Sequence, residues 1–150
     1  MSSIYDDIEN WIEYITTPIN SYQICPFAKK AKYFIHPSED FLSIQMRASF
    51  FDKRYDLLIC RPTDKFMSVD RAKQIEKECN KLASSTITLL DHPDDPGFID
   101  DICTSNKKHI LFLIQPKKDL LEARKQLQKT SYYDRWSEEY YKKICHNNFY

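Results

Sequence analysis

The chain has a single glycine, Gly97, among its 150 residues, and this scarcity limits the sites that it can build. Phosphate-binding loops and dinucleotide-binding fingerprints need several closely spaced glycines, because a backbone without side chains lets its N–H groups approach the phosphates. The sequence therefore excludes a P-loop and the usual Rossmann fingerprint, and we expect no cofactor.

The length and charge of the chain narrow the class of protein. Residues 1–150 are about the size of one domain, and 42% hydrophobic with 29% charged residues is typical of an ordinary globular protein. The 22 basic and 22 acidic residues give a net charge of zero, so no long-range field would concentrate nucleic acid or an anionic membrane around the protein. We expect a single globular domain that does not bind nucleic acid.

The cysteines indicate a reducing compartment. There are five of them, an odd number, and they form no Cys-x-x-Cys pair, which argues against a secreted disulfide framework and against a zinc ribbon. The N-terminus carries acids where a signal peptide would carry cations, and no run approaches the roughly 20 apolar residues that span a bilayer. We expect a cytoplasmic protein with free cysteines, no bound metal and no membrane contact. The cysteines are Cys25, Cys60, Cys79, Cys103 and Cys145.

Helical spacing of apolar residues predicts several helices. One runs from Ile4 to Ile15, and another begins after Ser68, a good N-cap, and continues to about Ala83. A short helix is expected from Pro26, because proline is well tolerated at the first helical position. Two more helices are expected after Pro116 and after Ser131.

Four segments have the pattern of strands. Leu42–Met46 alternates apolar and polar residues, and Asp56–Cys60 is a short apolar run, so the two are expected to pair as a hairpin across Ser49–Tyr55. Thr86–Leu90 is rich in β-branched residues. His109–Ile114 is nearly continuous in apolar residues, which predicts a central strand buried on both faces.

These elements predict the α+β class, with a small mixed or antiparallel sheet of about four strands packed by helices in a two-layer sandwich.

Cys25 is the leading candidate for chemistry. It precedes Pro26 and would occupy the N-cap of the short helix, where the helix dipole favours an anion. Lys29 and Lys30 follow on the same helix and would favour the thiolate further. This pattern is that of a nucleophile, whereas the alternative is a small apolar residue packed beside Phe27.

The loop after the third predicted strand is the second candidate. His92 is followed by Pro93 and lies among the carboxylates of Asp91, Asp94 and Asp95. An imidazole oriented by a carboxylate is suited to act as a general base, and a cluster of carboxylates suits a weak divalent-metal site. The alternative is an acid-rich turn in which the aspartates bond their own backbone.

Three segments carry a resemblance to a known family. Trp11–Glu13, Ile24–Lys29 and Thr88–Pro93 resemble a family of uncharacterised bacterial proteins that share a Leu-Cys-Pro-Phe-Ala signature. This resemblance implies no activity, but it draws attention to Cys25 and His92.

Two functions follow from these observations. The first is a non-catalytic module that binds another protein or regulates it. The second is a small thiol-dependent enzyme in which Cys25 is the nucleophile or redox centre and His92 is the base. The sequence leaves open whether the protein is an enzyme, and it does not identify a small-molecule substrate.

Overall fold

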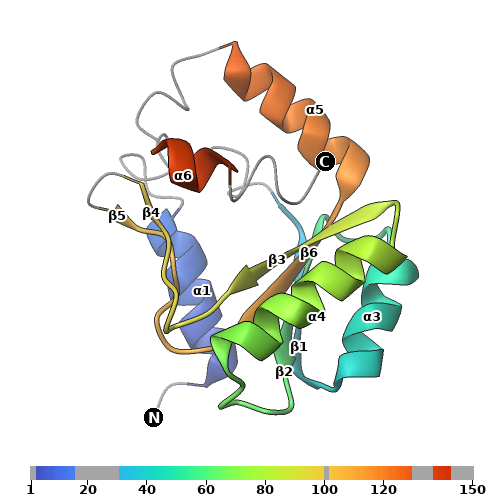
Figure 1. Ribbon diagram of the computed structural model, residues 1–150, viewed down its shortest axis with the longest axis vertical. Helices are drawn as coiled ribbons and strands as arrows, with labels where there is room; N and C mark the ends of the chain where they lie inside the picture. Colours follow the sequence, from blue (N-terminus) through green and yellow to red (C-terminus); the bar gives the residue numbers. More distant parts are fainter. Residues whose placement is uncertain (1–2, 16–30, 100–101, 130–136, 143–150) are drawn as a thin grey trace.

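The computed structural model describes residues 3–15, 31–99, 102–129 and 137–142 (Figure 1). Along the chain, helices alternate with the strands of one main sheet, and a short two-stranded ribbon precedes its last strand. The elements are α1 (Ile4–Ile15), β1 (Tyr33–Glu39), α3 (Phe41–Ser49), β2 (Leu57–Pro62), α4 (Val69–Leu82), β3 (Thr86–Asp91), β4 (Phe98–Ile99), β5 (Ile102–Cys103), β6 (Leu111–Pro116), α5 (Lys117–Gln128) and α6 (Glu138–Tyr141).

The main sheet has four strands in the order β1-β2-β6-β3. β1 is parallel to β2, and β6 is antiparallel to both of its neighbours, β2 and β3. Leu113 of β6 pairs with Ile59 on one side and with Leu89 on the other, so β6 is a central strand as the sequence predicts. The α+β class and the mixed sheet of four strands packed by helices are confirmed.

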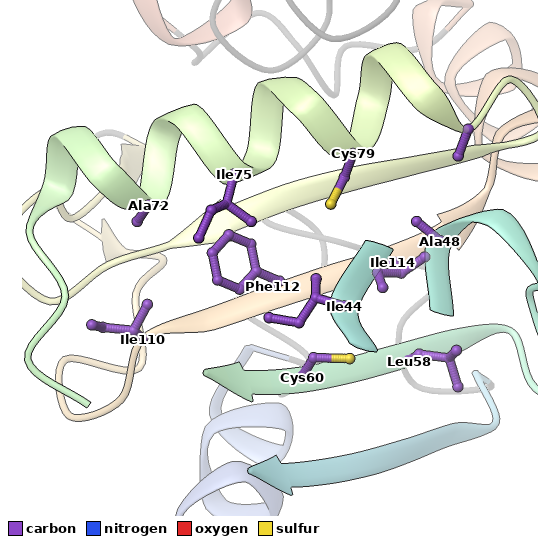
Figure 2. Packing of buried hydrophobic residues seen from close by; sticks show 11 residues of the cluster. Ile44, Ala48, Leu58, Cys60, Ala72, Ile75, Cys79, Ile110, Phe112 and Ile114 are labelled. Atoms are coloured by element: carbon purple, nitrogen blue, oxygen red, sulfur yellow. The ribbon is translucent and has the colours of Figure 1, made fainter. Parts of the chain in front are cut away.

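Helices α3 and α4 cover one face of the sheet (Figure 1). Figure 2 shows Ile44 of α3 and Ile75 of α4 directed toward Cys60 of β2 and Phe112 of β6. All four side chains are fully buried. Cys60 and Phe112 face this layer because successive residues of a strand alternate between its two faces. This layer forms the larger part of the core.

Helix α1 packs on the opposite face of the sheet. Ile4 and Ile8 contact a second cluster that contains Ile35, Ile59 and Leu111. Leu111 and Phe112 are therefore both buried, one on each face, which is the arrangement that a continuous apolar strand predicts. The expected sandwich of helices on a sheet holds for α3 and α4, and α1 adds a helix on the other side.

Two of the predicted helices are capped by serines, α4 by Ser68 as the sequence predicts and α1 by Ser3. The hydroxyl oxygen of Ser3 accepts a hydrogen bond from the N–H of Asp6 at 3.1 Å, and that of Ser68 accepts one from the N–H of Arg71 at 3.2 Å. Each bond satisfies one of the N–H groups that have no partner in the first turn of a helix. The predicted helix after Pro116 is also confirmed as α5. The expected short helix after Pro26 and the start of the helix after Ser131 lie outside the described residues.

The predicted strand Leu42–Met46 is wrong, because this segment is the middle of helix α3. Asp40 caps the helix, its carboxylate accepting a hydrogen bond from the N–H of Ser43 at 2.8 Å. The predicted hairpin across Ser49–Tyr55 is also wrong. α3 instead connects β1 to β2, which lets these two strands run parallel.

Strand β1 has no counterpart among the predicted strands, since His36 and Pro37 indicate a loop. Pro37 is tolerated in β1 because β1 lies at the edge of the sheet and its pairing with β2 is irregular between His36 and Glu39. The other edge, β3, is covered by α4. The side chain of Asn80 donates to the carbonyl of Thr88 at 2.9 Å and accepts from its N–H at 2.7 Å, and Glu76 accepts from the N–H of Leu90.

Candidate functional site

The first candidate site lies outside the described residues. Cys25, Lys29 and Lys30 belong to the segment 16–30, so the thiol at a helix N-cap and its distance from His92 stay predictions.

His92 lies in the turn after β3 and is 3% exposed. Its Nδ1 accepts a hydrogen bond from the N–H of Asp94 at 3.0 Å. The other ring nitrogen, Nε2, therefore carries the proton and donates to the carbonyl oxygen of Met67 at 2.7 Å. Both nitrogens are occupied by backbone groups, so His92 ties this turn to the segment that precedes α4, and action as a base requires one of these bonds to break.

The carboxylates of Asp91, Asp94 and Asp95 have different surroundings. Asp91 is buried and accepts hydrogen bonds from Asn106, one from the N–H at 3.0 Å and one from Nδ2 at 2.6 Å. Its burial raises its pKa above the ordinary value. Asp95 forms an ion pair with Lys73 of α4 at 3.3 Å, whereas Asp94 is exposed. Among the described residues, no group of three or more His, Cys, Asp or Glu side chains is arranged to hold a metal ion.

A polar cluster that the sequence does not indicate joins α1 to the sheet. The Nε2 of His109, just before β6, lies 2.8 Å from the carboxylate of Asp7, and the Nζ of Lys108 lies 3.3 Å from the same carboxylate. The Nδ1 of His109 lies 3.4 Å from the guanidinium of Arg61, which follows Cys60 in β2. Because a guanidinium only donates, Nδ1 is the acceptor and the Nε2–H donates to Asp7. The cluster fastens three elements together and leaves no ring nitrogen open.

Two of the described cysteines are poor nucleophiles. Burial raises the pKa of the Cys60 thiol to about 12 and that of the Cys79 thiol to about 11. Both lie in the core between the sheet and α4, and Cys103 is also buried. The side chains of Cys60 and Cys79 therefore serve as part of the hydrophobic core.

A shallow depression, open to solvent, lies between α1 and β1. It is lined by Tyr5 and Glu9 of α1 and by Tyr33, Phe34 and Ile35 of β1. Glu9 is the one carboxylate among these residues, and no thiol or imidazole accompanies it. The depression therefore lacks the pairing of a base with a nucleophile that covalent catalysis uses.

The outer face of α3 carries exposed apolar side chains. Leu42 and Met46 of α3, and Phe50, which caps its C-terminal end, recur every four residues and are 67%, 60% and 79% exposed. Residues four apart lie on the same side of a helix, so these side chains form one stripe about 12 Å long that points away from the core. We call these three residues the α3 stripe. Exposed apolar residues that are scattered singly are common on protein surfaces, whereas these three are neighbours on one side of the helix.

None of the described helices is long and apolar enough to cross a membrane. Comparison of the chain with protein-family models, with curated proteins and with solved structures finds no match.

Proposed function

We propose that this protein is a cytoplasmic, non-catalytic interaction or regulatory module that binds a helix of a polypeptide chain on the α3 stripe. The observation that carries this proposal is the exposure of Leu42, Met46 and Phe50 along one side of α3 and its C-terminal cap. The other side of the helix is buried through Ile44 and Ala48.

The packing of the described residues does not require the three side chains of the α3 stripe to be apolar. Ile44 and Ala48 already anchor α3 to the core, and Asp40 already caps it. A helix on the surface of a globular protein buries one apolar side against the core, and its opposite side normally carries charged and polar residues. A helix that is apolar on two opposite sides matches the pattern of a helix that lies between two partners, here the sheet and a second molecule.

The described polar groups favour binding over catalysis. Both nitrogens of His92 and of His109 contact fixed partners, and burial raises the pKa values of Cys60 and Cys79. The thiol-dependent enzyme rests on Cys25 alone, for which the alkylation experiment in the Discussion is the test.

In the test, Met46 is replaced by an amino acid with a photoactivatable side chain, and the protein is produced and irradiated in the cell. We expect it to cross-link to a polypeptide, and the same side chain placed at position 5, on the opposite side of the sheet, to give no such product. The captured chain must then bind the purified domain. Met46→Asp should weaken that binding by about tenfold or more, since central interface residues dominate affinity, and Tyr5→Asp should leave it unchanged. Equal binding by wild type and Met46→Asp contradicts the proposal.

A further inference from the structure

The α3 stripe is close to symmetric about its central residue. Leu42 and Phe50 lie four residues before and after Met46, and Ser43 and Ser49 lie three residues before and after it. In a pair of antiparallel helices that cross at Met46, each Leu42 lies beside Phe50 of the partner subunit, and the small serines leave room for close approach. Such an arrangement is isologous, because the same patch serves on both molecules.

The charges at the two ends of α3 favour the antiparallel arrangement. Glu39 and Asp40 lie at the N-terminal end, and Arg47 and Lys53 lie toward and beyond the C-terminal end. Glu39 is 3.4 Å from Arg47 of its own chain, whereas Asp40, the N-cap of α3, and Lys53, four residues after its last residue, are both exposed. An antiparallel pair brings the acidic end of each helix to the basic end of the other, twice, and also opposes the helix dipoles favourably. A parallel pair would place like charges together.

We infer that the molecule bound on the α3 stripe is a second copy of this chain, in an antiparallel dimer of α3 helices that crosses at Met46. This inference rests on the proposed function and names its partner. The contact involves three side chains from each copy, whereas each partner contributes about 20–30 residues to a standard interface. The dimer is therefore weak and reversible, with a dissociation constant on the order of 10–100 μM.

The first test is sedimentation equilibrium of the purified protein over a range of concentrations up to several hundred micromolar, on the order of ten times the expected dissociation constant. Wild type should pass from monomer to dimer over this range. Met46→Asp places two carboxylates against each other at the crossing and should raise the dissociation constant by about tenfold or more. Lys53→Glu should raise it several-fold, and Tyr5→Asp, a half-exposed aromatic on α1, should not change it.

The second test establishes the direction of the helices by disulfide formation. Cys25 and Cys145, the two cysteines outside the described residues, are first replaced by serine, and the remaining three cysteines are buried. Leu42→Cys and Phe50→Cys should then cross-link to each other when mixed, and each should form little dimer alone. Met46→Cys alone should form a dimer, because it lies at the crossing.

The outcomes separate the inference from the proposed function. A protein that stays monomeric up to several hundred micromolar overturns the second copy as partner. A Leu42→Cys variant that readily cross-links to itself overturns the antiparallel arrangement of the two helices. If the photoactivatable side chain at position 46 still captures another protein, whose binding Met46→Asp weakens, the proposed function stands with a different partner. If it captures nothing and the protein is monomeric, both fail.

Discussion

The imidazole of His109 lies 2.8 Å from the carboxylate of Asp7, although 102 positions of sequence separate them. Asp7 is on α1, and His109 lies two residues before the first residue of the central strand β6. The bond joins the helix on one face of the sheet to the end of its central strand, and the guanidinium of Arg61 fixes the other side of the ring.

This pair makes stability depend on pH in the acid range. The hydrogen bond from His109, with help from Lys108, holds the pKa of Asp7 below its ordinary value of 3.8. A carboxyl with a lowered folded pKa stabilises the fold above the unfolded pKa and loses that contribution as the pH falls through the folded pKa. The urea midpoint of Asp7→Asn should therefore be lower than that of wild type at neutral pH, and the gap should close below about pH 4. A gap that stays constant with pH would show that the charge of Asp7 contributes nothing.

Two threonines of β3 should respond oppositely to the same substitution. The hydroxyl of Thr86 donates to the carbonyl of Ala48 at 2.7 Å, whereas the buried hydroxyl of Thr88 has no partner among the described residues. Thr86→Val should cost about 1–3 kcal/mol of the free energy of unfolding, because it leaves a buried carbonyl without its donor. Thr88→Val should be neutral or stabilise by up to about 1 kcal/mol. Chemical denaturation measures both, and a loss above about 1 kcal/mol for Thr88→Val would mean that its hydroxyl is bonded.

The sequence correctly predicts those elements of the fold whose apolar residues all face the core. Ala72, Ile75 and Cys79 recur at helical spacing because one side of α4 faces the core, and the apolar run from Leu111 is central because both faces of β6 are covered. Local pattern and tertiary packing agree in these elements, so the prediction is right.

The prediction fails for α3, because its apolar residues lie on two different sides of the helix. Ile44 faces the core, while Leu42 and Met46 belong to the exposed stripe, so apolar residues fall at every second position and imitate a strand.

The Asp7–His109 pair could not be predicted from the sequence for another reason. Nothing local to either residue indicates a partner 102 positions away, which only the packing of α1 on the sheet brings near.

The central strand gives a direct test of the core. Leu111 is fully buried against α1, so Leu111→Ala should lower the free energy of unfolding by about 2–5 kcal/mol. Leu113 lies on the same face but is only half-buried, and Leu113→Ala should cost less. Urea denaturation at neutral pH measures both. A loss below about 0.5 kcal/mol for Leu111→Ala, the range of surface substitutions, contradicts the placement of β6.

Thiol reactivity tests the enzyme alternative. With pKa values of about 12 and about 11, Cys60 and Cys79 carry almost no thiolate at neutral pH and should alkylate very slowly in the folded protein. Cys25 should react faster than either if it caps a helix beside Lys29 and Lys30. Mass spectrometry after alkylation identifies the modified cysteine. If Cys25 reacts no faster than Cys60, the nucleophile hypothesis is wrong and the interaction module stands without a competitor.

The α3 stripe faces outward, although a core residue, Ile44, lies only two positions from Met46. The most direct measurement is the free energy of unfolding of Ile44→Ala and Met46→Ala, each compared with wild type in dilute solution, where a weak dimer is dissociated. Ile44→Ala should cost about 2–5 kcal/mol, because it removes a fully buried side chain. Met46→Ala should stay within about 0.5 kcal/mol of wild type. If Met46→Ala costs as much as Ile44→Ala, the stripe is covered within the folded monomer and the face is not a docking surface.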